Sequence, residues 1–275
     1  MTQTELLRTA RRLVVKVGST SVTGENVGQI PVLIDTLAAA HARGTEVVLV
    51  SSGAMATALP FMQLSERPSD LATQQATAAV GQNKLMWRYQ TELDRHSMLA
   101  GQVLLTASDM EHETPRTNAR RAMDRLLKMG ILPIVNENDT VATYEIRFGD
   151  NDRLAALVAE LIGADALVLL SDVDAIYTKP PKLPGAERVR IVRAEDDLAG
   201  IEIGESDSAV GTGGAGTKVA SALYAAEHGT STLITSTPLL SDALAGADVG
   251  TWFPAQADSS TSLNLGSDAA TAISS

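Results

Sequence analysis

The stretch that decides the fold is Leu13-Val14-Val15-Lys16-Val17-Gly18-Ser19, a short apolar run that opens into a loop of small residues. Such a run is typical of a buried strand in a parallel sheet. We expect strands at Leu13–Val17, Glu46–Val50, Gly101–Leu105, Leu132–Val135, Ala166–Leu170, Thr232–Ile234 and Val249–Phe253. Apolar residues three or four positions apart predict helices between them, at Val27–Ala42, Ala72–Leu93, Asn118–Met129, Leu154–Ile162 and Val219–His228. The alternation predicts a mostly parallel, doubly wound α/β sheet.

The composition excludes several classes of protein. Of the 275 residues 44% are hydrophobic but only 3% aromatic, which suits an aliphatic core around a helix-covered sheet. The net charge of −11 argues against nucleic acid as a partner. Without cysteine there is no disulfide, and the four scattered histidines predict no metal site made by the protein. No apolar run reaches the roughly 18 residues of a membrane span, and Met1–Arg12 lacks a signal-peptide core, so we expect a cytoplasmic protein with no membrane contact.

Two of the six lysines lie beside glycine-containing loops. Lys16 precedes Gly18, and Lys218 closes the run Gly211-Thr212-Gly213-Gly214-Ala215-Gly216-Thr217. An acidic chain holds a polyphosphate only where backbone N–H groups and a few cations gather, so this pair indicates phosphotransfer. The glycine run fits neither the dinucleotide fingerprint nor the Walker A pattern. Its alternative interpretation is an ordinary surface turn, and Lys16 could instead extend to solvent from a strand end.

Polar sequences follow the predicted strands at their carboxyl ends, where ligands bind in doubly wound sheets. They are Gly18-Ser19, Ser51-Ser52-Gly53, Asn136-Glu137-Asn138-Asp139 and Ser171-Asp172. Gly149-Asp150-Asn151-Asp152 stands just before a predicted helix. We expect their amides and carboxylates to bind a small polar substrate. Polar turns and a helix N-cap are the alternative.

These motifs, together with Val80-Gly81-Gln82 and Gly101-Gln102-Val103-Leu104-Leu105, resemble the glutamate 5-kinases of proline biosynthesis, in the amino acid kinase superfamily. The resemblance runs from about Leu13 to Phe253. It implies a three-layer α/β/α amino acid kinase fold and transfer of the γ-phosphate of ATP to the side-chain carboxylate of L-glutamate. That carboxylate is already ionised at pH 7, so the reaction needs no general base and depends on positioning and charge stabilisation.

The resemblance also implies roles for single residues. Lys16 and Lys218 would be catalytic, with Asp152 holding them in place. Glutamate would be bound by Ser52, Gly53, Asn136, Asp139, Asp150 and Asn151, with Asp139 accepting from its ammonium group and Asn151 donating to a carboxylate. The nucleotide would contact Lys16, Gly18, Ser171, Asp172, Thr212, Gly213, Gly214, Ala215, Gly216, Thr217 and Lys218, and would carry Mg²⁺. Expected partners are proline as a feedback inhibitor, a second copy of the chain, and the reductase that consumes glutamyl phosphate.

The chain also departs from the family. Many members continue into a C-terminal PUA domain, whereas here we expect a kinase domain over residues 1–254 and a disordered tail over 255–275. Ala58, Ala175 and Ser236 stand where members often have glycine. Thr178–Gly211 is expected to be a surface excursion with one strand at Arg188–Val192. Two other functions stay open, a kinase for a different acidic amino acid or analogue, and a non-catalytic amino-acid sensor.

Overall fold

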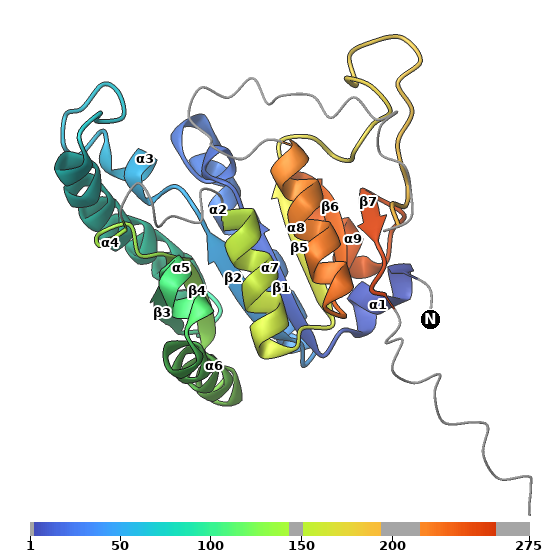
Figure 1. Ribbon diagram of the computed structural model, residues 1–275, viewed down its shortest axis with the longest axis horizontal. Coiled ribbons are helices and arrows are strands. Elements are labelled where there is room, and N and C mark those ends of the chain that lie inside the picture. Colours follow the sequence, from blue (N-terminus) through green and yellow to red (C-terminus); the bar gives the residue numbers. More distant parts are fainter. Residues whose placement is uncertain (1–2, 143–150, 194–214, 257–275) are drawn as a thin grey trace, which may run out of the picture.

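The computed structural model describes residues 3–142, 151–193 and 215–256, and its centre is one seven-stranded sheet (Figure 1). The strand order is β3-β4-β2-β1-β5-β6-β7. All neighbours are parallel except β7, which is antiparallel to β6. The strands are β1 (Arg12–Val17), β2 (Glu46–Ser51), β3 (Ala100–Leu105), β4 (Leu132–Glu137), β5 (Ala166–Ser171), β6 (Ser231–Ser236) and β7 (Thr251–Phe253).

Helices cover both faces of the sheet. One face packs against α1 (Gln3–Thr9), α2 (Gln29–Ala42), α3 (Ala54–Ala58), α4 (Leu71–Asp94) and α9 (Leu240–Ala245). The other face packs against α6 (Glu113–Lys128), α7 (Asn151–Ile162) and α8 (Ala215–Glu227), and the short α5 (Ala107–Glu111) precedes α6. In Figure 1, α7 and α8 lie side by side in front of the sheet. The expected three-layer α/β/α architecture is therefore confirmed.

The alternation of side chains along β1 decides which layer each residue enters. Leu13, Val15 and Val17 belong to the core on the α2 and α4 side, and Val14 belongs to the core on the α7 and α8 side. Because successive side chains of a strand point to opposite faces, Lys16 points the same way as Val14. The strand thus directs Lys16 toward α7 and α8.

All seven predicted strands and all five predicted helices are present. The short helices α1, α3, α5 and α9 and the 3₁₀ turns Ser19–Ser21, Gly24–Gly28 and Thr237–Leu239 escaped prediction, because one or two turns carry too few residues for a period to appear. The strand predicted at Arg188–Val192 was wrong. Arg188 and Ile191 form only isolated bridges, to Tyr177 and Trp252. The predicted tail from residue 257 and the segment 194–211 lie outside the described residues.

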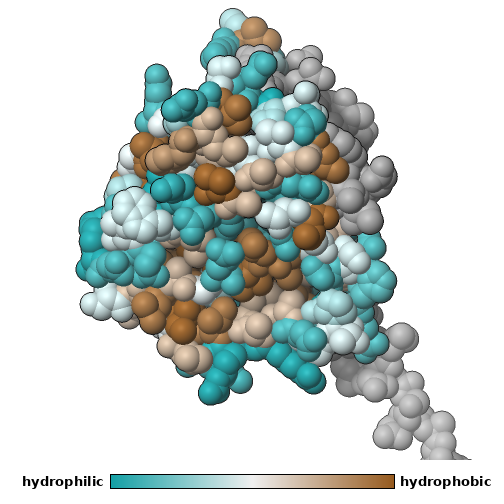
Figure 2. Space-filling view, turned by 90° about the vertical axis from the view of Figure 1, so that its left-hand side faces the viewer, coloured by the Kyte–Doolittle hydropathy of each residue, from teal (hydrophilic) through white to brown (hydrophobic). Residues whose placement is uncertain are grey.

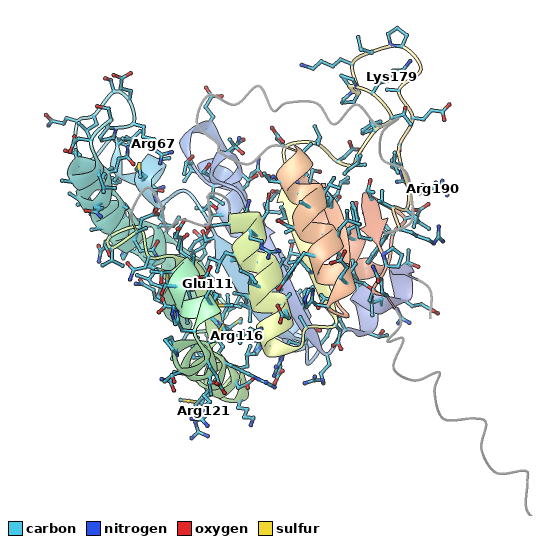
Figure 3. All side chains as sticks on the ribbon, viewed as in Figure 1. Arg67, Glu111, Arg116, Arg121, Lys179 and Arg190 are labelled. Atoms are coloured by element: carbon cyan, nitrogen blue, oxygen red, sulfur yellow. The ribbon has the colours of Figure 1, made fainter. Side chains whose placement is uncertain are left out.

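Many charged side chains lie on the surface of this fold. Figure 3 shows Arg67, Arg121 and Arg190 extending outward, and all three are exposed. Within the described ranges 3–142, 151–193 and 215–256, no helix combines the length and the apolar character that crossing a membrane requires. Only a few charged residues are buried among the described ones, and they include Lys16 and Asp152.

Candidate active site

Asp152, in the first turn of α7, bridges the two lysines that the sequence singled out. Its Oδ1 lies 2.5 Å from Nζ of Lys16, and its Oδ2 lies 2.9 Å from Nζ of Lys218. The side chain of Asp152 is 0% exposed, that of Lys16 4% and that of Lys218 12%. Lys16 comes from β1 and Lys218 from the start of α8, so three elements far apart in sequence meet at one carboxylate.

The charge balance of this group is positive, with two ammonium groups for one carboxylate. An unpaired charge is costly to bury, and Asp152 offsets that cost for both lysines. The group lies beside the first turn of α8, where Ala215, Gly216 and Thr217 precede Lys218. The N-terminus of a helix carries unpaired N–H groups and a partial positive charge, which favour an anion. The arrangement is suited to receiving a negatively charged phosphate.

A second cluster is built from side-chain amides. Asn151 Nδ2 donates to the backbone oxygen of Ser51 at 2.7 Å, to Oδ1 of Asn136 at 2.7 Å and to Oγ of Ser52 at 3.0 Å. Asn136 Nδ2 in turn donates to Oε1 of Gln82 at 2.8 Å. This cluster joins the ends of β2 and β4 to α7 and α4, and Asn151 places it directly beside Asp152 in sequence.

The loop after β2 is held by a buried tyrosine and by Gly53. The Tyr89 hydroxyl lies 2.8 Å from Oγ of Ser51, and burial raises the pKa of this tyrosine well above its ordinary value. Gly53 has φ +93°, which favours glycine, and a Cβ there would lie 3.3 Å from Cα of Ser19. Gly53 thus lets the loop after β2 lie close to the loop after β1.

The other predicted nucleotide residues lie at the same edge of the sheet. Ser171 ends β5 and its hydroxyl donates to Oδ1 of Asp172 at 3.1 Å. Ser171 pairs in register with Ser236 of β6. The nearest atoms to a Cβ built at Gly18 are 3.9 Å away, so neighbouring protein atoms do not themselves require glycine there.

The structure brings Lys16, Lys218 and Asp152 together, and it brings Asn136, Asn151 and Ser52 together beside them. Asp139 follows β4 in the loop at the same end of the sheet. Asp150, Thr212, Gly213 and Gly214 lie outside the described residues. Ala58 and Ala175, two of the departures from the family, are 0% and 1% exposed, so methyl groups are accommodated in the core at both positions.

Sequence reasoning missed Gln82 and Tyr89 as parts of this site. Both lie on α4, inside a helical pattern with several other polar residues. The available signal is the motif Val80-Gly81-Gln82, which contributed to the family resemblance without a role being assigned to Gln82. In the structure a Cβ at Gly81 would overlap the backbone oxygen of Ala54. Only glycine allows α4 to approach α3 so closely, and this contact carries Gln82 toward the site.

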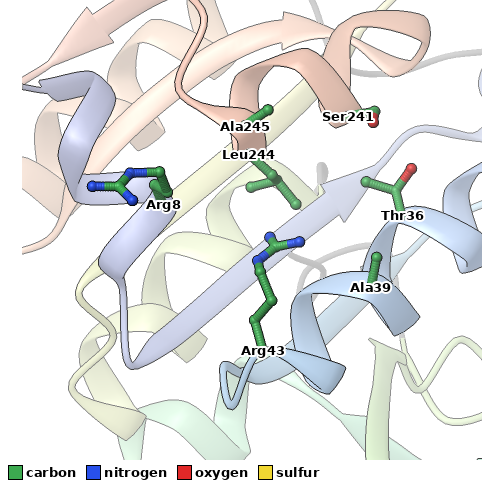
Figure 4. Close-up of a pocket in the computed structure, with 7 residues that line it drawn as sticks. All are labelled: Arg8, Thr36, Ala39, Arg43, Ser241, Leu244 and Ala245. Atoms are coloured by element: carbon green, nitrogen blue, oxygen red, sulfur yellow. The ribbon is translucent and has the colours of Figure 1, made fainter.

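A cavity of about 480 Å³ lies elsewhere, between α1, α2 and α9 (Figure 4). Its lining includes Arg8, Arg43 and Leu244. In Figure 4 the Arg43 side chain extends toward Leu244, whereas the head of Arg8 turns away from it. Arg43 follows α2 and precedes β2, so the cavity lies at the amino ends of the strands, opposite the lysine and amide clusters.

Comparisons with known proteins identify the family of this chain. The model of the amino acid kinase family matches residues 11–236. The chain is 67% identical to a glutamate 5-kinase of Leifsonia xyli, covering 91% of this chain and 93% of that protein. It is 64% identical to one of Clavibacter sepedonicus, covering 90% and 95%, and 54% identical to one of Streptomyces coelicolor, covering 90% and 67%.

Solved structures share the fold at low sequence identity. A carbamate kinase from Giardia lamblia bound to AMP-PNP has a TM-score of 0.66 at 16% identity, covering 90% of this chain and all of that one. An isopentenyl phosphate kinase from T. acidophilum has a TM-score of 0.60 at 16% identity, with 88% and 99% covered. From the family model and the close relatives together, the chain belongs to the amino acid kinase family and, within it, to the glutamate 5-kinases.

Proposed function

We infer that the protein transfers the γ-phosphate of ATP to the γ-carboxylate of L-glutamate, giving γ-glutamyl phosphate, the first step of proline biosynthesis. The observation that carries this inference is the buried Asp152 with one lysine on each carboxylate oxygen, at the carboxyl edge of a parallel sheet. Membership of the glutamate 5-kinase family supports glutamate as the acceptor.

In this mechanism no residue abstracts a proton, because the attacking carboxylate is ionised at neutral pH. Lys16 and Lys218 neutralise negative charge that develops on the phosphoryl oxygens as the bond to ADP breaks. Asp152 fixes both ammonium heads before substrate arrives, so little reorganisation is required during the reaction. Mg²⁺ would enter on the nucleotide and offset charge on its phosphates.

The remaining predicted residues divide into two groups. We propose that Ser52, Asp139 and Asn151, with Gly53, Asn136 and Asp150, bind glutamate. We propose that the nucleotide contacts Gly18, Ser171, Asp172 and the run Thr212, Gly213, Gly214, Ala215, Gly216 and Thr217. The position of Ser171 at the end of β5 and of Ala215 to Lys218 at the start of α8 supports the second group.

We also propose three partners in a cytoplasmic setting. Proline carries the ammonium and α-carboxylate of glutamate without its second carboxylate, so it competes as a feedback inhibitor. Glutamyl phosphate is a reactive acyl phosphate, which favours direct transfer to its reductase.

The third partner is a second copy of the chain. Figure 2 shows apolar side chains gathered on the face that carries α4, β3 and α6. On it, Trp87 is 66% exposed, Leu99 61% and Met129 59%. Among the described strands β3 pairs only with β4, and a free strand edge beside an apolar surface favours self-association.

A coupled assay of ADP release tests the proposed function. Glutamate should support turnover, and aspartate should not, because its carboxylate stops more than about 1 Å short of the attacking position. N-acetylglutamate should fail as well, since it lacks the ammonium group. Turnover of N-acetylglutamate or aspartate at the rate of glutamate would favour the other acidic-amino-acid kinase, and no turnover with any of them would favour the sensor.

A further inference from the structure

The backbone fixes which way the two asparagine side chains of the amide cluster face. The backbone oxygen of Ser51 can only accept, so the Asn151 atom 2.7 Å from it must be the amide nitrogen. The backbone N–H of Glu137 can only donate, so the Asn136 atom 2.9 Å from it must be the carbonyl oxygen. Neither side-chain amide can be flipped, because a flip would place a donor against a donor or an acceptor against an acceptor.

This orientation uses all the hydrogen-bond donors of Asn151. Its amide nitrogen has two hydrogens and already faces three acceptors, on Ser51, Ser52 and Asn136. No N–H remains for a substrate carboxylate. The role expected from the sequence, Asn151 as donor to a carboxylate, therefore does not fit the geometry.

Two groups of this cluster remain for the substrate, an acceptor oxygen on Asn151 and a donor hydroxyl on Ser52. Within residues 3–142, 151–193 and 215–256, the Oδ1 of Asn151 makes no hydrogen bond, and it is not among the fully buried atoms. The hydroxyl oxygen of Ser52 accepts from Asn151, which leaves its own O–H to donate. An acceptor thus lies beside a donor, as an amino acid's ammonium and α-carboxylate require.

Gln82 completes the chain of amides from the side of α4. Its Oε1 accepts from Asn136 Nδ2 at 2.8 Å, and the residue is only 8% exposed. Without this acceptor the Asn136 amide would lose its partner inside the protein, which is costly. Gln82 therefore helps to hold Asn136, and through it Asn151, in the orientation described above.

We propose that the Gln82–Asn136–Asn151 chain presents the Asn151 carbonyl to the substrate's ammonium group and leaves the Ser52 hydroxyl to bind the α-carboxylate. Gln82 is a positioning residue in this arrangement, because it acts through Asn136. The proposal rests on glutamate being the substrate and specifies how the same site recognises its amino-acid end.

Two glutamate analogues test the assignment of donor and acceptor. Glutarate lacks the ammonium group, and 4-aminobutyrate keeps it but lacks the α-carboxylate. Competition of each analogue against glutamate is measured in the parent enzyme, in Asn151→Ala and in Ser52→Ala. Asn151→Ala should weaken the binding of glutamate and 4-aminobutyrate by roughly 10- to 100-fold, the range for a hydrogen bond to a charged group, and leave that of glutarate within about twofold. Ser52→Ala should weaken glutamate and glutarate and spare 4-aminobutyrate.

The opposite pattern, with glutarate weakened by Asn151→Ala as much as glutamate, would overturn the proposal. Turnover of glutamate by the parent enzyme reports on the proposed function separately. An error in the assigned donor and acceptor roles can therefore be distinguished from an error in the proposed function.

Variants of Gln82 test the positioning role without touching the substrate. Gln82→Met should raise the KM for glutamate about tenfold and leave the KM for ATP unchanged, and Gln82→Glu, which keeps an acceptor oxygen, should recover most of that loss. The matched control is Gln90→Met, on the same helix. Gln90 accepts from the backbone of Ala100 and donates to that of Met98, so the control should lower the melting temperature with no change in the glutamate KM. Equal effects of Gln82→Met and Gln90→Met on the glutamate KM would refute the positioning role.

Discussion

The substitution Asp152→Asn separates the two tasks assigned to this carboxylate, balancing buried charge and fixing two catalytic ammonium groups. The asparagine side chain has nearly the same shape, but it carries no charge and sets an NH₂ group against one of the lysines. Asp152 is 0% exposed, and its two oxygens lie 2.5 and 2.9 Å from the lysine nitrogens. Removing one partner of a buried ion pair costs about 3–5 kcal/mol.

For a chain of this size about 1 kcal/mol shifts the melting temperature by roughly 2–4 °C, so Asp152→Asn should lower it by about 6–20 °C. At a temperature where the variant is folded, kcat should fall by roughly 10²–10³, because both ammonium heads lose their fixed position. Thermal denaturation and steady-state ADP release measure the two effects.

The double variant Asp152→Asn, Lys16→Met sharpens this test. Removing the ammonium of Lys16 should recover much of the stability, because the more deeply buried of the two lysine charges is then gone and only Lys218, 12% exposed, keeps a charge without its carboxylate. Activity should not recover, since Lys16 itself is lost. An Asp152→Asn protein with the parent's melting temperature and kcat would refute the reasoning and reduce Asp152 to a helix-capping residue.

Three further predictions concern the surroundings of the site. Gly81→Ala should destabilise the fold by several kcal/mol, because its Cβ would overlap the Ala54 backbone. Gly28→Ala is the control, since the space around Gly28 is open and no loss of stability is expected. Equal melting temperatures of the two variants in thermal denaturation would contradict the close packing at Gly81. Burial raises the pKa of Tyr89 above its ordinary value of 10.0. The contribution of Tyr89 to folding stability is therefore complete below pH 10. It declines at higher pH, because the tyrosine ionises in the unfolded chain before it ionises in the folded protein. Tyr89→Phe should therefore flatten the alkaline loss of stability, and an unchanged slope in pH-dependent denaturation would argue against a neutral buried phenol. Asp139→Ala should raise the glutamate KM and weaken proline inhibition together, with the ATP KM unchanged, and a lost ATP affinity would remove Asp139 from the amino-acid pocket.

The apolar pattern was sufficient to predict the layered fold. Leu13–Val17 and its counterparts are short apolar runs, and in a sheet buried on both faces such runs have few alternatives. The antiparallel direction of β7 was not predictable in this way, because a run such as Val249–Phe253 is compatible with either direction. Short helices such as α3 were missed because one or two turns hold too few residues to show a helical period.

The site was predictable as a set of residues but not as a set of hydrogen bonds. Glycines beside Lys16 and Lys218 indicated a phosphate site, and the family resemblance implied that Asp152 holds both lysines. The structure adds that this carboxylate is buried and pairs one oxygen with each lysine. The donor or acceptor role of Asn151 depends on the acceptors that lie next to it, which are the backbone oxygen of Ser51 and the side chains of Ser52 and Asn136. Those groups belong to β2, to the residue after it and to β4, and the fold brings them to Asn151, so the residue type alone could not reveal the role. Gln82 was missed for the same reason.

Trapping of the product tests the central claim most directly. Acyl phosphates react with hydroxylamine to give hydroxamates, so the enzyme is incubated with ATP, Mg²⁺, L-glutamate and hydroxylamine, and the product is identified by mass spectrometry. The account predicts γ-glutamyl hydroxamate in step with ADP release, reduced by roughly 10²–10³ in Lys16→Ala. ADP release without hydroxamate, or equal hydroxamate formation by Lys16→Ala, would contradict phosphoryl transfer to the glutamate carboxylate at this lysine site.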